Sequence, residues 1–318
     1  MPTLIGQSIP RVEGTQKVTG KGGYTADTLL PGMLWGKLLR SSEPHALLKK
    51  VDATKARSLP GVKAVLTGKD IGSLRQGTFL RDWEVLCTDR VRLVGDPIAA
   101  VAADDPDVAE EALHLIDVEY EPLQVINDPV KALAKDAAII HPDRPSYQGG
   151  PTEMPPHLNL QGQSTFSKGD VEQGFRDADL VFENEFYSGR QHQGYIEPRS
   201  CVVAIEPDGT VRVWSSTKAR YRLRSLLASL FGLETEKVVL EPVSLGGDFG
   251  GKGAIGHEAI AYLLAKETGR PIRILRSYTE ELMAGNPRHG LVIRTKTGVK
   301  KDGAIVARDV EIFVDGGA

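Results

Sequence analysis

The sequence of 318 residues contains only two cysteines, Cys87 and Cys201, and neither lies in a C-x-x-C pair. An iron–sulfur cluster or a structural zinc ion is usually held by four ligands, most of them cysteines, so this chain cannot supply either site by itself. We therefore expect two buried, reduced thiols, as is usual in a cytoplasmic protein.

The sequence also lacks a long apolar run and a lysine- or arginine-rich run, and its formal net charge is only −3. A membrane-spanning helix needs about 18 consecutive apolar residues, so none is expected. The near-neutral charge argues against nucleic acid and membrane surfaces as partners. The start, MPTLIGQSIPRVEG, has neither the basic nor the apolar region of a secretory signal, and we expect a cytoplasmic protein.

What is present favours a globular α/β protein of about two domains, with 41% apolar and 25% charged residues. Residues 1–125 are expected to form one α/β unit. Short apolar runs at 32–41 and 91–104 predict strands, and 105–116 predicts a helix with Asp105 as its N-cap.

Residues 126–163 are dense in proline and glycine and are expected to form a linker or surface loop. Regular patterns resume over 164–318. The expected strands are 180–189, 200–206, 210–216, 238–245 and 270–277, followed by a hairpin over 291–318, and the expected helices are 223–231 and 257–269. The sequence ends at Ala318 directly after a strand, which suggests a truncated or split protein.

The motif with most chemical content is GGDFGGKG, residues 246–253, between an apolar strand and a helix. Gly246 to Lys252 fits the phosphate loop G-x-x-x-x-G-K, but Gly253 follows, so the hydroxyl that would hold Mg²⁺ is missing. A second strand ending in an acid, EIFVD at Asp315, is a weak match to the other half of such a site.

Residues 251–256 also fit the dinucleotide fingerprint G-x-G-x-x-G, in a β–α–β arrangement. The fingerprint starts several residues after the strand, and the next strand ends at Arg276 without the acid that binds ribose. A glycine-rich connection that lets the helix pack close to the sheet is the structural alternative. Phe249 favours a binding loop instead, because glycines flank it on both sides and a phosphate loop needs no aromatic ring there.

The loop resembles the GGGFGGK loop of the molybdenum hydroxylases, the xanthine dehydrogenase and aldehyde oxidase family. Ordered matches extend over nearly the whole chain. PRVEGTQKVTGKGGYTAD, PGMLWGKLLRSSEPHA, LPGVKAVLTGKDI and VRLVGDPIAAVAAD resemble the family's hammerhead domain, and GYIEPRSCVVAIEPDGTVRVWSST and GNPRHGLVIRTKTG resemble its molybdopterin-binding region. The resemblance implies an α/β (α+β) fold with a hammerhead domain at 1–125, a linker at 126–163 and an incomplete molybdopterin-binding domain at 164–318.

The resemblance also implies an activity. A molybdenum-dependent hydroxylase or dehydrogenase oxidises an aldehyde or N-heteroaromatic carbon with water, and electrons leave through iron–sulfur clusters and a flavin. The expected cofactor is molybdenum-molybdopterin, in its cytosine dinucleotide form, with [2Fe–2S] clusters and FAD on partner subunits. Gly253 replaces a substrate-binding glutamate that some family members have after the loop lysine, which argues against xanthine as substrate.

By position in the motif, the resemblance assigns cofactor-binding roles to Gly247, Phe249, Gly250 and Lys218. Phe249 would lie beside the metal centre, the Gly250 amide would point at a molybdenum ligand, and Gly247 would allow close approach of the cofactor. Lys218 stands where the family has a glutamine, and it either adds positive charge near the metal or points to solvent. No side chain of this chain is expected to ligate the metal directly.

No catalytic residue is expected in this chain, because the family's general-base glutamate would lie beyond Ala318, and the chain alone should be inactive. The expected partners are an iron–sulfur small subunit, an FAD-binding medium subunit and the other half of the molybdopterin region if the subunit is split. Two alternatives stay open: a nucleotide-binding β–α–β domain that uses the Gly246–Gly256 loop, and a non-catalytic fragment that docks partners. Glu197 and Arg199 are candidates for an active-site pair, but a surface ion pair at a strand end is the favoured interpretation.

Overall fold

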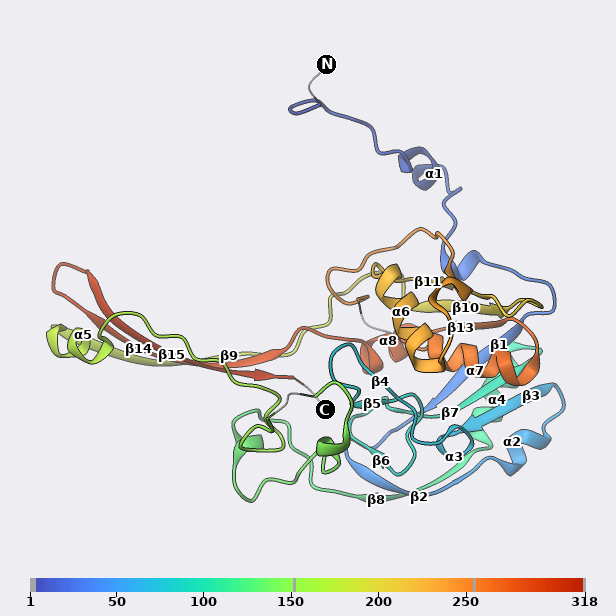
Figure 1. The fold of residues 1–318 in the computed structure, drawn as a ribbon, viewed down its shortest axis with the longest axis horizontal. Helices are drawn as coiled ribbons and strands as arrows, with labels where there is room; N and C mark the ends of the chain where they lie inside the picture. Colours follow the sequence, from blue (N-terminus) through green and yellow to red (C-terminus); the bar gives the residue numbers. More distant parts are fainter. Residues whose placement is uncertain (1–3, 151–152, 254–255, 317–318) are drawn as a thin grey trace.

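The computed structural model describes residues 4–150, 153–253 and 256–316. Its centre is a seven-stranded sheet in the order β12–β11–β10–β13–β1–β7–β3 (Figure 1). The strands are β1 (Leu34–Arg40), β3 (Val62–Thr67), β7 (Pro97–Ala103), β10 (Ser200–Ile205), β11 (Val211–Ser215), β12 (Val238–Leu240) and β13 (Ile272–Leu275). The mixed α/β class therefore agrees with the prediction.

One pair of strands joins the two halves of the chain into this sheet. Strand β1 pairs in parallel with β13, with Leu34 opposite Ile272 and Gly36 opposite Ile274. A Cβ atom on Gly36 would lie 2.6 Å from the Ile274 side chain, so the glycine permits the close packing at this junction. The patterns of the two halves predict their strands but not this continuity between them.

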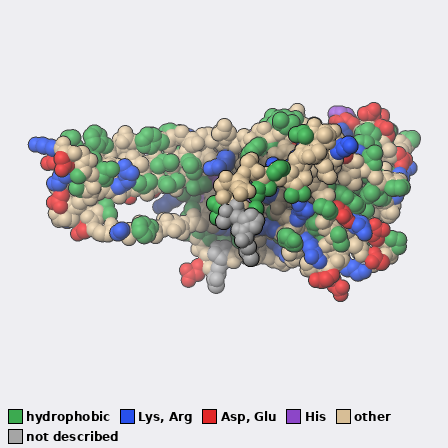
Figure 2. All heavy atoms as spheres, turned by 90° about the horizontal axis from the view of Figure 1, so that it is seen from above, with side chains coloured by type: hydrophobic (Ala, Val, Ile, Leu, Met, Phe, Trp, Pro, Cys, Tyr) green, Lys and Arg blue, Asp and Glu red, His purple; other side chains and the backbone are tan. Residues whose placement is uncertain are grey.

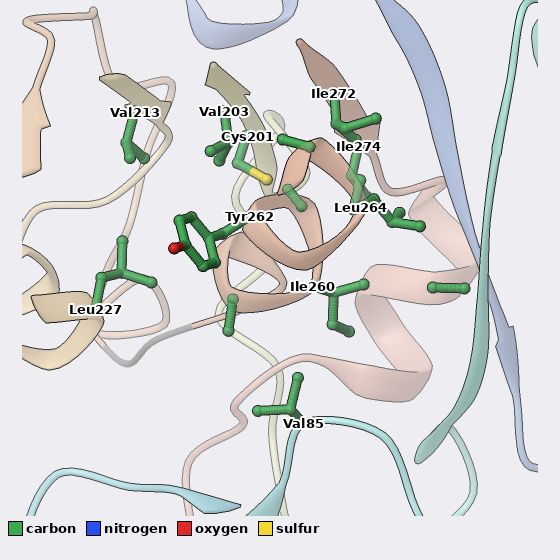
Figure 3. Packing of buried hydrophobic residues seen from close by; sticks show 14 of the residues in the cluster. Val85, Cys201, Val203, Val213, Leu227, Ile260, Tyr262, Leu264, Ile272 and Ile274 are labelled. Carbon is green, nitrogen blue, oxygen red and sulfur yellow. The ribbon is translucent and has the colours of Figure 1, made fainter. Parts of the chain in front are cut away.

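Helices cover both faces of the sheet. Helices α6 (Arg220–Phe231) and α7 (Glu258–Thr268) pack on one face, and α2 (Thr54–Ser58) and α4 (Pro106–His114) pack on the other. Strand β7 is buried along its whole length, and its alternate residues enter the two separate cores. Figure 3 shows the α7 side, where Leu264 lies beside Ile274 of the sheet and Ile260 points toward Val85.

The Asp105 N-cap and the hairpin expected over 291–318 are confirmed, the latter in its described part as the antiparallel pair β14 (Gly290–Val299) and β15 (Ile305–Asp315). The Asp105 side chain accepts a hydrogen bond from the Asp107 amide at the start of α4. Helices α6 and α7 end at Gly232 and Gly269, both left-handed, as expected for glycine caps. The Asp208-Gly209 turn joins β10 and β11 as an antiparallel pair.

Two small sheets accompany the seven-stranded sheet in the N-terminal part of the chain. Strand β2 (Ala46–Asp52) lies between β6 (Arg90–Val91) and β8 (Asp117–Pro122), and β4 (Arg75–Gln76) pairs with β5 (Trp83–Glu84). The remaining short helices are α1 (Gly14–Val18), η1 (Thr25–Asp27), α3 (Gly68–Ile71), η2 (Lys131–Leu133), η3 (Arg144–Ser146) and η4 (Thr235–Lys237). The described part of 126–163 contains no strand, and buried Arg144 binds the carbonyls of Leu158, Leu160 and Gln161.

A long arm projects from this body. It consists of β9 (Leu180–Ser188), β14 (Gly290–Val299) and β15 (Ile305–Asp315), with helix α5 (Val171–Asp177) at its tip (Figure 1). One face of the arm carries ion pairs, such as Arg294 with Glu185. The other face exposes apolar side chains that Figure 2 shows along the arm, among them Phe182, Phe186 and Ile312.

Both cysteines are buried and free, as predicted, and burial raises the pKa of each thiol well above its ordinary value. In the described ranges, no helix has both the length and the apolar character needed to cross a membrane. The prediction of a truncated or split protein rests on the end of the sequence at Ala318, which lies outside the described residues.

Three histidines make the fold sensitive to mild acid. Burial lowers the pKa of His45 and His257, and burial with nearby arginines lowers that of His141 to about 3. Below pH ~6.5 the unfolded histidines bind protons that the folded ones exclude, so stability is complete above that pH and falls below it. We expect the free energy of unfolding to fall between pH 7 and 5.5, by at most about 1.4 kcal/mol per pH unit for each histidine.

Urea denaturation at a series of pH values in this window measures that slope. The window lies above the ordinary pKa of carboxylates, but burial raises the pKa of Asp82 and Asp96, so the contribution of a histidine is read from its variant. His141→Gln should reduce the slope, because it removes the histidine whose pKa burial lowers to about 3. A slope that His141→Gln does not change would contradict the assignment.

Candidate cofactor-binding site

The loop of residues 246–253 leads toward helix α7 and has an unusual backbone. Gly247 and Gly250 are left-handed, with φ of 98° and 103°. Phe249 has φ of 47° and is the only non-glycine residue with positive φ in the described ranges. Its side chain is 72% exposed, so no burial of the ring compensates for the strain. Such strained, exposed residues concentrate at functional sites, which makes this loop the first candidate.

A buried ion pair holds the loop from beneath. Glu197 Oε2 accepts hydrogen bonds from the Gly246 amide at 2.7 Å and from Lys252 Nζ at 2.8 Å. The Lys252 side chain is fully buried, and its ammonium group lies 4.6 Å from the centre of the Tyr195 ring. One carboxylate therefore joins the first and the seventh residue of the loop, and an aromatic face shares the lysine charge.

Below this pair lies a second buried cluster, around Glu281 of helix α8 (Tyr278–Ala284). Glu281 accepts hydrogen bonds from the Tyr195 hydroxyl and the Arg199 amide, and Arg276 Nη1 is 3.6 Å from Glu281 Oε2. Burial raises the Glu281 pKa, but Arg276, Tyr195 and Arg199 outweigh it and keep the pKa below its usual value. Arg199 also donates to the Gly251 carbonyl, so the cluster reaches the loop.

The glycines of the loop face these supports at close range. A Cβ atom on Gly251 would lie 2.5 Å from Tyr195 Cε1, and one on Gly246 would lie 2.6 Å from Glu197 Cβ. At Gly250, by contrast, an added Cβ would meet nothing within 4 Å. The inner side of the loop is thus packed against protein, while its apex at Phe249 and Gly250 stays open.

A single methyl group should test this packing. We expect Gly251→Ala to lower the free energy of unfolding by about 1–3 kcal/mol, because the methyl group overlaps the Tyr195 ring. Gly23→Ala is the matched control, since its Cβ would meet no atom within 4 Å and its backbone is not left-handed. The midpoint of urea denaturation measures both. Equal midpoints for the two variants would show that the loop is not packed as described.

Lys218 contacts the loop directly. Its Nζ forms an ion pair of 2.8 Å with Asp248 Oδ2, and its amide donates to the Lys252 carbonyl. The ammonium group of Lys218 is therefore paired with a loop carboxylate, while 48% of the side chain remains exposed to solvent. The sequence analysis did not predict this partner, although Asp248 is the one acidic residue of the motif.

The structure corrects the interpretation of Glu197 and Arg199. They are not a surface ion pair, because Arg199 is only 5% exposed and each binds a different partner beneath the loop. Tyr195 and Glu281 were not predicted as parts of the site, and the motif did not show that Lys252 is buried against Glu197. The clue was the apolar strand 200–206 directly after YIEPRS, since charges beside a buried strand are usually paired.

The geometry fits a cofactor that meets protein backbone. Phe249 presents an exposed ring, and Gly250 leaves room for close approach at the apex. The supports beneath fix the amide groups in place, so they need little reorganisation when a ligand arrives. The part of the fingerprint at Ala254 and Ile255 lies outside the described residues. These features define an α/β protein with a glycine-rich loop whose apex is open and whose base is held by a buried ion pair.

Comparison with known families identifies that class. Residues 152–318 match the molybdopterin cofactor-binding domain, and residues 19–124 match the a/b hammerhead domain of aldehyde oxidase and xanthine dehydrogenase. The chain belongs to the aldehyde oxidase and xanthine dehydrogenase family and carries its molybdopterin cofactor-binding domain. The predictions of family and fold class are confirmed, and the matches do not support the nucleotide-binding alternative.

Individual relatives agree over nearly the whole chain. A probable xanthine dehydrogenase subunit of Bacillus subtilis is 41% identical over 97% of this chain. The nicotinate dehydrogenase large molybdopterin subunit of Eubacterium barkeri is 34% identical over 99%. The solved aldehyde oxidoreductase of Desulfovibrio gigas is 30% identical over 96%, with a TM-score of 0.85.

The chain is shorter than each of these relatives. It spans 40% of the Bacillus protein, 71% of the Eubacterium protein and 34% of the Desulfovibrio protein. The matched part is therefore only a portion of each relative, and the function of the whole protein has to be argued separately.

Proposed function

We propose that this chain is the molybdopterin-binding part of a molybdenum hydroxylase that oxidises an aldehyde or N-heteroaromatic carbon with water. The loop of residues 246–253 carries the proposal, because it combines an open apex with a buried, charged support. The membership of the family and the strained backbone of Phe249 support the same function.

In this proposal the residues of the loop position the cofactor. Gly247 and Gly250 would allow close approach of the cofactor, Phe249 would present its ring to it, and the Gly250 amide would be the donor toward it. Lys218 contributes through its ion pair with Asp248. The molybdenum cofactor, when bound, supplies the two-electron oxidation of the substrate carbon. Glu197 and Lys252 keep the loop backbone fixed during that reaction.

The rest of the machinery is assigned to partners. The general-base glutamate belongs to the part of the molybdopterin region that this chain does not cover. An iron–sulfur subunit and an FAD-binding subunit receive the electrons, in keeping with the two isolated buried cysteines of this chain. We further propose the cytosine dinucleotide form of the cofactor and a cytoplasmic location.

The test is the metal and nucleotide content of the protein purified with its partners. We expect molybdenum equimolar with the chain, iron in the same complex, and cytidine monophosphate after acid hydrolysis. Absence of molybdenum, with partners present and the cofactor pathway active in the cell, would overturn the function. Release of another nucleotide would overturn only the dinucleotide assignment.

A variant links that content to the loop. Phe249→Ala should reduce bound molybdenum severalfold, because an aromatic contact contributes about 0.5–1.5 kcal/mol. The ring is exposed, so the stability of the protein should change little. Phe166→Ala removes another exposed ring, outside the loop, and should retain full molybdenum. Equal molybdenum in both variants would remove Phe249 from the site.

A further inference from the structure

The Asp248 carboxylate is the centre of the hydrogen bonds inside the loop. Oδ1 accepts from the Lys252 amide, and Oδ2 accepts from the Gly250 amide at 3.2 Å. Lys218 Nζ binds Oδ2 from outside the loop at 2.8 Å. Two loop amides and one ammonium group therefore share a single, mostly buried carboxylate.

Lys218 is itself fixed by the main chain. Its amide and the Thr217 hydroxyl both donate to the Lys252 carbonyl, each at 3.2 Å. The segment 217–218 thus holds the end of the loop by its backbone and the apex by the lysine side chain. The lysine is therefore tied to the loop at both ends, although 48% of its side chain stays exposed to solvent.

The contact from Asp248 to the Gly250 amide closes the turn around Phe249. The bond places the strained residue between two tethered neighbours, which explains how an exposed ring keeps a left-handed backbone. It also engages the amide that the proposed function directs at the cofactor. Lys218 competes for the same oxygen atom and so limits how strongly the carboxylate attracts that amide.

We infer that Asp248 and Lys218 form a positioning pair that fixes the apex of the loop and sets how strongly the Gly250 amide donates to the bound cofactor. The second half of this inference rests on the proposed function. Both residues also depart from the motifs of the resemblance, since Asp248 occupies a glycine position of GGGFGGK and Lys218 a glutamine position. The two departures meet in space and neutralise each other's charge.

The first experiment needs no cofactor. Hydrogen exchange of the Gly250 and Lys252 amides is measured in the full chain as purified. Asp248→Ala should accelerate both about tenfold, because each amide loses a bond to a charged acceptor. Asp208→Ala is the matched control, since Asp208 pairs with Lys237 at the opposite end of β10 and β11. Unchanged exchange at Gly250 would overturn the inference.

The second experiment measures the midpoint potential of bound molybdenum. Lys218→Met removes a positive charge and should lower the potential, and Asp248→Asn removes a negative charge and should raise it. The double variant should return close to the original value. A purely structural role would change the molybdenum content but would not produce opposite shifts that cancel.

The outcomes separate the two proposals. Shifts of the same sign, or no shift with molybdenum bound, would overturn the role of the pair toward the cofactor. If the unmodified complex holds no molybdenum, the proposed function fails, and that role fails with it. Hydrogen exchange then still decides whether the pair fixes the apex of the loop.

Discussion

Replacing Glu281 with alanine should lower the free energy of unfolding by about 3–5 kcal/mol, the largest effect expected for a single substitution in this chain. The side chain is fully buried, and its carboxylate faces Arg199 and Arg276. Removing it leaves two buried guanidinium groups without their anion and the Tyr195 hydroxyl without its acceptor.

The pKa of Arg276 shows that burial already disfavours the charged groups around Glu281. Burial, with Arg40 and Arg199 nearby, lowers the pKa of Arg276 to about 10 even with Glu281 present. Loss of the carboxylate removes an interaction that keeps Arg276 charged, so the cluster becomes more costly to bury.

Guanidinium denaturation of the two proteins measures the effect, provided that the slope with denaturant stays constant. Glu267→Ala is the matched control, because Glu267 lies on the exposed side of α7 and should change stability by less than about 0.5 kcal/mol. A loss of stability no larger than that of the control would show that the cluster is not a buried ionic centre. Because Tyr195 and Arg199 link the cluster to the loop, Glu281→Ala should also reduce bound molybdenum.

Local chemistry made much of this fold predictable. Helix α4 begins where an aspartate precedes a proline, and α6 and α7 end where glycine can turn left-handed. These signals depend on neighbouring residues alone. The pairing of β1 with β13 depends on strands far apart in the sequence, and no local pattern encodes it.

The site also has a part that adjacent residues predict and a part that depends on residues far apart in the sequence. The glycine pattern around Phe249 marks the loop, because the residues that make its backbone unusual are adjacent in sequence. Its supports come from Tyr195, Glu197 and Glu281, and only the fold brings them beneath it. The interpretation of Glu197 and Arg199 as a pair is wrong because neighbours in sequence need not be partners in space. Each in fact binds a residue on another element.

Ion pairs to residues outside the loop compensate for its many glycines. Glycine allows the left-handed turns but increases the freedom of the unfolded chain, so the loop needs compensating contacts. The Glu197–Lys252 pair provides them from below and the Lys218–Asp248 pair from above. Two of the four paired charges, Asp248 and Lys252, belong to the loop, and Lys218 and Glu197 come from outside it.

The second large effect is therefore expected for the Glu197–Lys252 ion pair beneath the loop. We expect Lys252→Met to lower the free energy of unfolding by about 3 kcal/mol, because Glu197 stays in place with its main charged partner removed. Methionine fills most of the lysine volume, so the loss reports charge more than packing. Lys266→Met, on the exposed surface of α7, is the matched control and should change stability little.

The double variant Lys252→Met, Glu197→Gln identifies the cause. Glutamine can still accept the Gly246 amide bond but carries no charge, so the double variant should be more stable than Lys252→Met alone. Denaturation midpoints of the four proteins give the coupling between the two residues. Additive losses would mean that Lys252 and Glu197 act independently, and the loop would then owe its position to the glycine contacts with Tyr195 instead.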